Sequence, residues 1–138
     1  MTSARELMRA GADCVGADES VVLAAKRMAA LGVSALPIRG GDNLIRGMLT
    51  DRDIVVKVLA RERDPATTKA GELAQEELVA ADAGDDAPHV LRIMAANGMR
   101  RLPVLDGTEL IGTIGRAEVV RGLPDPQIGE LLDALALD

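Results

Sequence analysis

The sequence predicts an α+β protein made of two copies of one β-α-β-β-α unit, related by a pseudo-twofold axis and followed by a short C-terminal helix. A Leu-Pro-aliphatic strand pattern occurs twice, around Pro37 and Pro103, which lie 66 positions apart. The glycines within the apolar runs that follow, Gly47 and Gly112, lie 65 positions apart, and one loop deletion explains the difference. A solenoid needs at least about three repeats. The pattern therefore indicates a duplicated half-domain with a cleft along its axis.

The first unit is predicted from residue 14 to residue 59. Either Ser20 or Asp18 is a plausible N-cap, and the apolar residues that follow at helical spacing end at Gly32. Pro37 stands near the start of the next strand, where a missing N–H does least harm. The expected elements are an extended segment at 14–15, a helix at 21–31, strands at 35–38 and 44–49, and a helix from Thr50 to Leu59.

The second unit repeats this order, and residues 61–72 form the expected linker. Its elements are an extended segment at 78–81, a helix after Asp85 and Asp86, strands at 102–105 and 110–114, and a helix at 116–121. We therefore expect repeat 1 at residues 1–64, repeat 2 at 65–124 and a helical tail at 125–138. The tail has an apolar stripe, which either packs on its own domain or forms a dimer contact.

Composition excludes several classes of protein. The chain has 138 residues without Phe, Tyr or Trp, so its core is built from aliphatic residues and Met. Its net charge of −6 disfavours nucleic acid as a partner. The single cysteine, Cys14, forms no intrachain disulfide, and we expect it to be a small buried residue. Neither a signal peptide nor a membrane-spanning segment is evident, which favours a cytoplasmic protein.

These features together resemble a CBS domain pair, also called a Bateman module, over residues 4–123. The resemblance is carried by the repeated β-α-β-β-α order, by the two Leu-Pro strands and by the run Gly-Met-Leu-Thr-Asp-Arg-Asp at 47–53. The opening Ala-Arg-Glu-Leu-Met at 4–8 is further similar to stand-alone CBS-pair proteins of the actinobacterial hypoxic response kind. The resemblance implies a regulatory homodimer, not an enzyme, that binds an adenosine compound such as AMP, ADP or ATP between its repeats.

The resemblance also implies a ligand-binding motif at Gly47, Thr50 and Asp53. In the family pattern Gly-apolar-x-Thr-x-x-Asp, the carboxylate takes the ribose hydroxyls, and such charge-assisted bonds contribute about 1.5–3 kcal/mol each. A second interpretation is purely structural, because Thr50 and Asp53 also have the spacing of a helix cap. The second repeat has Gly115 and Glu118 at these positions. We therefore expect its site to bind a nucleotide differently, if it binds one.

Ligand phosphates need cations, and the resemblance points to basic residues just before the second Leu-Pro strand. Arg100 and Arg101 stand there, whereas the first repeat has Ser34 and Ala35. Arg116 is a further candidate. Because adjacent strand residues point to opposite faces, at most one of Arg100 and Arg101 is expected to enter the cleft, and both could simply be solvated.

The resemblance also implies that the base is held between aliphatic side chains and backbone amides, for which Pro37 and Ile38 are candidates together with Val15, Leu36 and Met48. No zinc-like ligand spacing and no catalytic set is present, and His89 is expected on a helix surface. Three functions compete. One is a sensor that binds an adenosine compound and acts on an unknown protein partner in trans, and another is a ligand-free dimeric structural protein of a stress response. The third, an enzyme, is the least favoured because the chain lacks a catalytic set.

Overall fold

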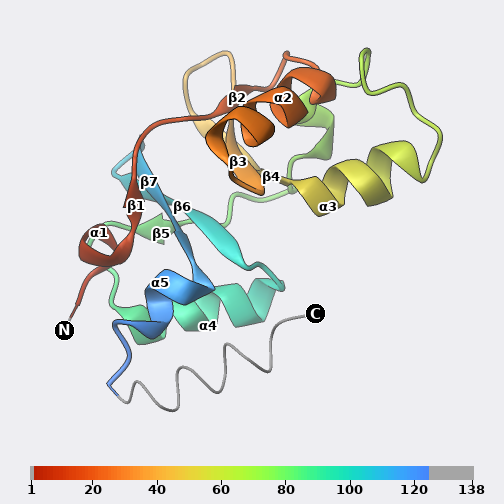
Figure 1. Ribbon diagram of the computed structural model, residues 1–138. Coiled ribbons are helices and arrows are strands. Elements are labelled where there is room, and N and C mark those ends of the chain that lie inside the picture. The colour runs from red at the N-terminus through yellow and green to blue at the C-terminus, as the bar shows by residue number, and fades with distance from the viewer. Residues whose placement is uncertain (1, 125–138) are drawn as a thin grey trace. The chain divides into compact units, whose positions relative to one another are not determined.

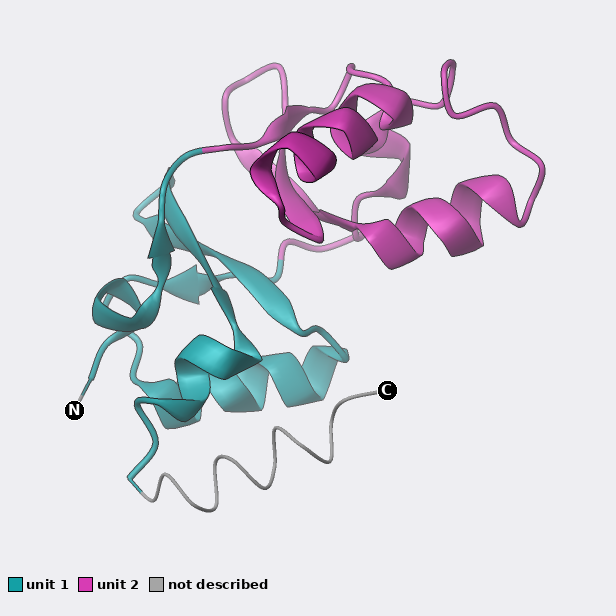
Figure 2. Cartoon of the chain, in the orientation of Figure 1, with its two compact units in different colours: residues 1–12, 79–138 teal, residues 13–78 magenta. Residues whose placement is uncertain are grey.

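The structure is a computed structural model, which describes residues 2–124. The described chain forms two compact units, shown in Figures 1 and 2. Unit 2, magenta in Figure 2, contains residues 13–78, and unit 1, teal, contains residues 2–12 together with 79–124. Neither unit contains a helix long and apolar enough to cross a membrane within the described range.

Unit 2 has a three-stranded sheet in the order β2-β3-β4. β2 is parallel to β3, and β3 is antiparallel to β4. The strands are β2 (Val15–Gly16), β3 (Ala35–Arg39) and β4 (Ile45–Thr50). The helices are α2 (Val21–Leu31), α3 (Asp51–Asp53), which continues as the π-helix η1 (Ile54–Leu59), and the short 3-10 helix η2 (Ala70–Leu73).

Local chemistry explains the bounds of α2, and burial explains where it packs. The Ser20 hydroxyl accepts a hydrogen bond from the Leu23 N–H at 3.2 Å, which satisfies one free donor of the first turn. Gly32 ends the helix with φ 67°, a left-handed conformation that glycine adopts without strain. The buried face of α2 joins the sheet and the later helices in one aliphatic core, formed by Val15, Val21, Ala24, Met28, Leu36, Ile38, Leu49, Val58, Ala70 and Leu73.

Unit 1 has a four-stranded sheet in the order β1-β7-β6-β5. Its strands are β1 (Arg9–Ala10), β5 (Ala81–Asp82), β6 (Arg101–Asp106) and β7 (Glu109–Gly115). Its helices are α1 (Ala4–Leu7), α4 (Ala87–Asn97) and α5 (Arg116–Val120). Asp86 caps α4 through the His89 N–H, and Gly98 ends it at φ 62°. A second aliphatic core lies between the sheet and these helices.

The two sheets have the same internal register, which confirms the duplication predicted from the sequence. The parallel strands pair at Val15 with Ile38 in one unit and at Ala81 with Val104 in the other, and both members are displaced by 66 positions. Each hairpin carries an irregularity directly after the second of these partners, Ile38 or Val104. The repeated β-α-β-β-α order is therefore present in both units.

Each repeat lends its leading segment to the sheet of the other repeat. The Ala4 N–H donates to the Asp85 carbonyl at 2.7 Å, and the Ala70 N–H donates to the Glu19 carbonyl at 2.8 Å. These two bonds are equivalent, because 4 and 70, and also 19 and 85, differ by 66 positions. The compact units are thus a different division of the chain from the sequence repeats.

The leading segments contain the elements that the sequence did not predict. α1, β1 and η2 were not expected, and η2 begins inside the expected linker 61–72. The predicted bounds of the strands differ from the observed ones by one to three residues at some ends, as at β5, which begins at Ala81. The predicted tail helix at 125–138 lies outside the described residues, and the pseudo-twofold axis stays a prediction.

Replacing Gly112 with Ala should lower the free energy of unfolding by about 1–3 kcal/mol, because the new methyl would overpack the β1–β7 contact. A Cβ at Gly112 would lie 2.6 Å from the Arg9 carbonyl oxygen and 2.7 Å from the Met8 sulfur. Urea unfolding followed by circular dichroism measures the loss. Gly41→Ala is the matched control, since nothing lies within 4 Å of a Cβ there. Equal effects of the two substitutions would contradict the packing argument.

Candidate functional site

Thr50 and Asp53 form a reciprocal capping box where β4 ends and α3 begins. The Thr50 hydroxyl accepts from the Asp53 N–H at 3.0 Å, and the Asp53 carboxylate accepts from the Thr50 N–H at 2.9 Å. Two free backbone donors are satisfied in this way. The structural interpretation of the motif is therefore confirmed, and a ligand role for the same residues is an additional question.

The Asp53 carboxylate retains capacity to accept further hydrogen bonds. Its Oδ2 atom takes the Thr50 N–H, while Oδ1 lies 3.3 Å from the Lys57 ammonium one turn later. Two carboxylate oxygens offer about four lone-pair positions. The side chain is 17% exposed, which leaves it sheltered but reachable. A pair of ligand hydroxyls could bond to it without breaking the cap.

Gly47 and Gln75 lie together on the free side of β4, and sequence reasoning did not single out Gln75. The Gln75 carboxamide accepts from the Met48 N–H at 2.9 Å and donates to the Met48 carbonyl at 3.0 Å. Gly47 has φ 158°, and a Cβ there would collide with the Gln75 side-chain oxygen. The absence of a side chain at Gly47 thus makes room for Gln75. One signal was available, since Gln75 lies 66 positions after Arg9.

Pro37 and Ile38 are part of the sheet interior. They pair with Met48 and Gly47 respectively on β4, so the hairpin brings Pro37 and Ile38 into one strand pair with Gly47 of the ribose motif. Ile38 is fully buried in the core, and Pro37 is also buried. Contact of either residue with a base stays a prediction.

The second repeat arranges the equivalent residues differently. Gly115 is the N-cap residue of α5, and no side chain caps this helix. The Glu118 carboxylate is 14% exposed and accepts from the Arg101 guanidinium at 3.3 Å. Arg101 also donates to the Thr113 hydroxyl at 3.0 Å. Each carboxylate thus has one cationic partner, Arg101 for Glu118 and Lys57 for Asp53. The difference is that Asp53 takes part in a cap of its helix, whereas the start of α5 has no side-chain cap.

The three arginines considered for phosphate lie in unit 1, whereas Gly47, Thr50 and Asp53 lie in unit 2. Arg101 begins β6 and bonds within its own sheet. Arg100 is exposed one residue before β6, and Arg116 is half-buried at the start of α5. Phosphate binding by any of them stays a prediction.

A model of the CBS domain matches residues 4–60 and 70–125, which is most of the chain. The chain belongs to the CBS-domain family. Hypoxic response protein 1 of Mycobacterium tuberculosis (strain ATCC 25618 / H37Rv) is 42% identical over 135 residues, covering 98% of this chain and 94% of the relative. CBS-domain proteins are generally regulatory rather than enzymatic.

Solved CBS structures share the fold. The crystal structure of Hypoxic Response Protein I with two coordinated zinc ions has a TM-score of 0.80 and 43% identity, covering 89% of this chain and 100% of that one. The structure of CBSX2 in complex with AMP has a TM-score of 0.71 at 22% identity, covering 88% of this chain and 95% of that one, and therefore shows a common fold alone.

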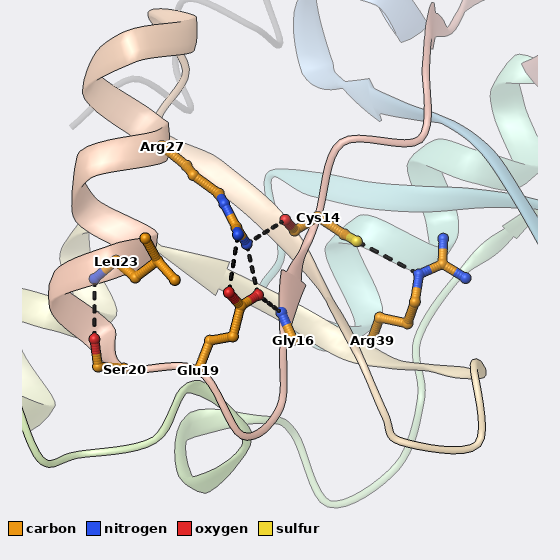
Figure 3. A network of polar contacts seen from close by, with 7 residues as sticks. All are labelled: Cys14, Gly16, Glu19, Ser20, Leu23, Arg27 and Arg39. Carbon is orange, nitrogen blue, oxygen red and sulfur yellow. Dashed lines mark hydrogen bonds and ion pairs between the residues drawn. The ribbon is translucent and has the colours of Figure 1, made fainter.

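A second polar cluster in this CBS protein joins β2 to α2, as Figure 3 shows. The Glu19 carboxylate accepts two bonds from the Arg27 guanidinium, at 2.6 and 2.8 Å, and one from the Gly16 N–H at 2.7 Å. The bonds from Arg27 and then Gly16 hold the pKa of Glu19 below its ordinary value. The bonds to Glu19 in turn raise the pKa of Arg27. Every contact is internal, so the cluster stabilises the fold.

Cys14 belongs to the edge of this cluster. Its carbonyl accepts from Arg27 at 3.1 Å, and its sulfur accepts from the Arg39 guanidinium at 3.4 Å (Figure 3). Cys14 is half-buried, so the expectation of a small buried residue is wrong, and its sulfur contacts a charged side chain instead of lying in the core. His89 is exposed on α4, as expected. The described part of the chain contains no group of three or more side chains able to hold a metal ion.

The Glu19–Arg27 pair should make stability depend on pH. Because the folded-state pKa of Glu19 is lowered, its contribution is complete above the unfolded-state pKa of about 4.3 and is lost as the pH falls through the folded value. Glu19 is 34% exposed, so solvent screening limits the contribution to about 1 kcal/mol. Glu19→Gln should therefore have a lower free energy of unfolding in urea than the wild type at pH 7, and the difference should shrink as the pH falls below about 4.3. A difference that is constant with pH would contradict this, and Glu76→Gln, at an exposed position, is the control.

Proposed function

We propose that this CBS protein is a non-enzymatic sensor that binds an adenosine compound, such as AMP, ADP or ATP, at the Thr50–Asp53 helix start. The supporting observation is the sheltered Asp53 carboxylate, which keeps acceptor capacity beyond its cap. Ribose supplies two neighbouring hydroxyl donors that match it. The family often binds adenosine nucleotides, and the CBSX2 structure with AMP has the same fold.

The proposal assigns the second helix start a lesser role. Glu118 faces the guanidinium of Arg101, which also donates to Thr113, whereas Asp53 faces the single ammonium of Lys57. A ribose at Glu118 would therefore have to compete with a cation that is held at two points. In the first repeat the position equivalent to Arg101 is Ala35, which carries no charge. One adenosine compound bound through Asp53 is therefore the stoichiometry that we expect for each chain. Arg100, Arg101 and Arg116 stay candidates for its phosphates.

Thermal melting against a panel of adenosine compounds tests the proposal. A ligand at about 100 times its Kd stabilises the folded state by about 2.7 kcal/mol, which raises the Tm by several degrees. Asp53→Asn should weaken binding about tenfold or more, because it removes the charge while keeping an oxygen for the Thr50 N–H. Glu118→Gln should change affinity little. A Tm unaffected by every compound would favour the ligand-free interaction protein.

We propose further that the protein forms a homodimer through η1 and passes its signal to a protein partner in trans. Of the six exposed large hydrophobic residues in the described chain, three lie on this one helix, namely Val55, Val56 and Leu59. Val55 is 55% exposed and Leu59 is 53% exposed. A second copy of the chain would bury this apolar face against an identical one. The relatives named for hypoxia suggest a stress response as the setting, and a cytoplasmic location stays a prediction.

Val55→Glu should convert the dimer into a monomer in sedimentation equilibrium, because a buried unpaired carboxylate opposes association. Arg61→Glu, at an exposed position two residues beyond η1, adds the same group outside the apolar face and should leave the dimer intact. A wild-type monomer at all concentrations, or a dimer unaffected by Val55→Glu, would contradict the proposal.

A further inference from the structure

The outer edge of β4 is covered by a side chain rather than by a strand. β4 is the last strand of its sheet, so the backbone groups on its free side need partners from outside the sheet. At Met48 both the N–H and the carbonyl bond to the carboxamide of Gln75, at 2.9 and 3.0 Å. The carboxamide thereby supplies one acceptor and one donor, as a neighbouring strand would.

The other repeat shows what a permanent cover of the same edge looks like. Gln75 is equivalent to Arg9, 66 positions earlier, and Met48 is equivalent to Thr113, since each opposes the proline of its hairpin. Arg9 pairs with Thr113 through the backbone, as part of β1. Removing that cover requires a strand to leave the sheet. Removing Gln75 from Met48 breaks two hydrogen bonds to a side chain and none between backbone groups, so a side-chain rotation is sufficient.

The removable cover lies beside the proposed nucleoside site. Met48 and Thr50 are two residues apart on β4, so their N–H groups face the same edge, about 7 Å apart. The Thr50 N–H is held by Asp53, and the Met48 N–H is held by Gln75. The Asp53 carboxylate, which would bind ribose, and the Gln75 carboxamide thus bond to neighbouring N–H groups along one strand edge.

An adenine base matches the groups that Gln75 occupies. A backbone N–H and carbonyl of one residue need an acceptor and a donor side by side. The carboxamide of Gln75 provides this pair, and so does adenine, whose exocyclic amine lies beside a ring nitrogen that accepts. A Cβ at Gly47 would point at the place that the Gln75 carboxamide occupies. Because glycine has no Cβ, the same place is open to a flat group such as a base.

We propose that Gln75 is a displaceable cover of the base subsite: an adenosine compound whose ribose bonds to Asp53 takes the Met48 N–H and carbonyl, and the carboxamide swings away. The inference rests on the proposed function and adds its regulation. Binding then includes the loss of two existing hydrogen bonds, so the affinity of the wild type is lower than the site itself would allow.

Isothermal titration calorimetry with AMP and ATP tests this cover. Gln75→Ala should bind about tenfold more tightly than the wild type, because no carboxamide has to be displaced. Gln75→Asn keeps the same chemistry but is one methylene shorter, so it should also bind more tightly, and it serves if the alanine variant folds poorly. Glu76→Ala, at the exposed neighbouring position, is the matched control and should bind as the wild type does. Weaker or unchanged binding by both Gln75 variants would overturn the cover.

Hydrogen exchange without ligand separates this inference from the proposed function. The Met48 amide should exchange faster in Gln75→Ala than in the wild type, whereas the Thr50 amide, held by Asp53, should be unaffected. Equal exchange at Met48 would overturn the cover whatever the ligand result. A different result would overturn the proposed function instead. In that case the Met48 amide exchanges faster in Gln75→Ala, but no adenosine compound binds to the wild type or to either Gln75 variant, so Gln75 covers no nucleoside site.

Discussion

The need to satisfy backbone groups at sheet edges organises this protein. A repeat of the form β-α-β-β-α leaves the outer side of its second hairpin strand unpaired, and unpaired buried N–H and carbonyl groups are costly. The chain meets this need by exchanging leading segments, so that β1 covers β7 and the segment after η2 covers β4. Equivalent bonds from Ala4 and Ala70 fix both segments. Each compact unit is therefore completed by residues from the other repeat.

The exchange is symmetric in topology but not in chemistry. β7 receives a backbone partner at Thr113, whereas β4 receives the carboxamide of Gln75 at Met48. The helix starts that follow these strands also differ. Asp53 caps its helix and keeps acceptor capacity, while Glu118 lies against Arg101. One duplicated frame thus holds two different arrangements of the same carboxylate position, one that caps its helix beside Lys57 and one that bonds to Arg101.

Much of the frame follows from short-range chemistry that is legible in the sequence. Ser20 and Thr50 are caps recognised by residue type, and Gly32 ends a helix because it tolerates a positive φ. β1 could not be recognised, because a two-residue strand bonded through its backbone leaves no side-chain pattern. The Arg101–Glu118 contact joins residues 17 positions apart, so neither spacing nor composition pointed to it.

The sequence by itself determined the duplication, the order of elements in each repeat, the helix caps and the motif at Gly47, Thr50 and Asp53, because each depends on periodicity or on contacts within a few residues. Only the tertiary structure decided which carboxylate bonds to an arginine, and which strand edge is covered by the Gln75 side chain. Both contacts join segments that are distant in the sequence. The packing of the sheets, rather than local residue preference, brings these segments close together in space.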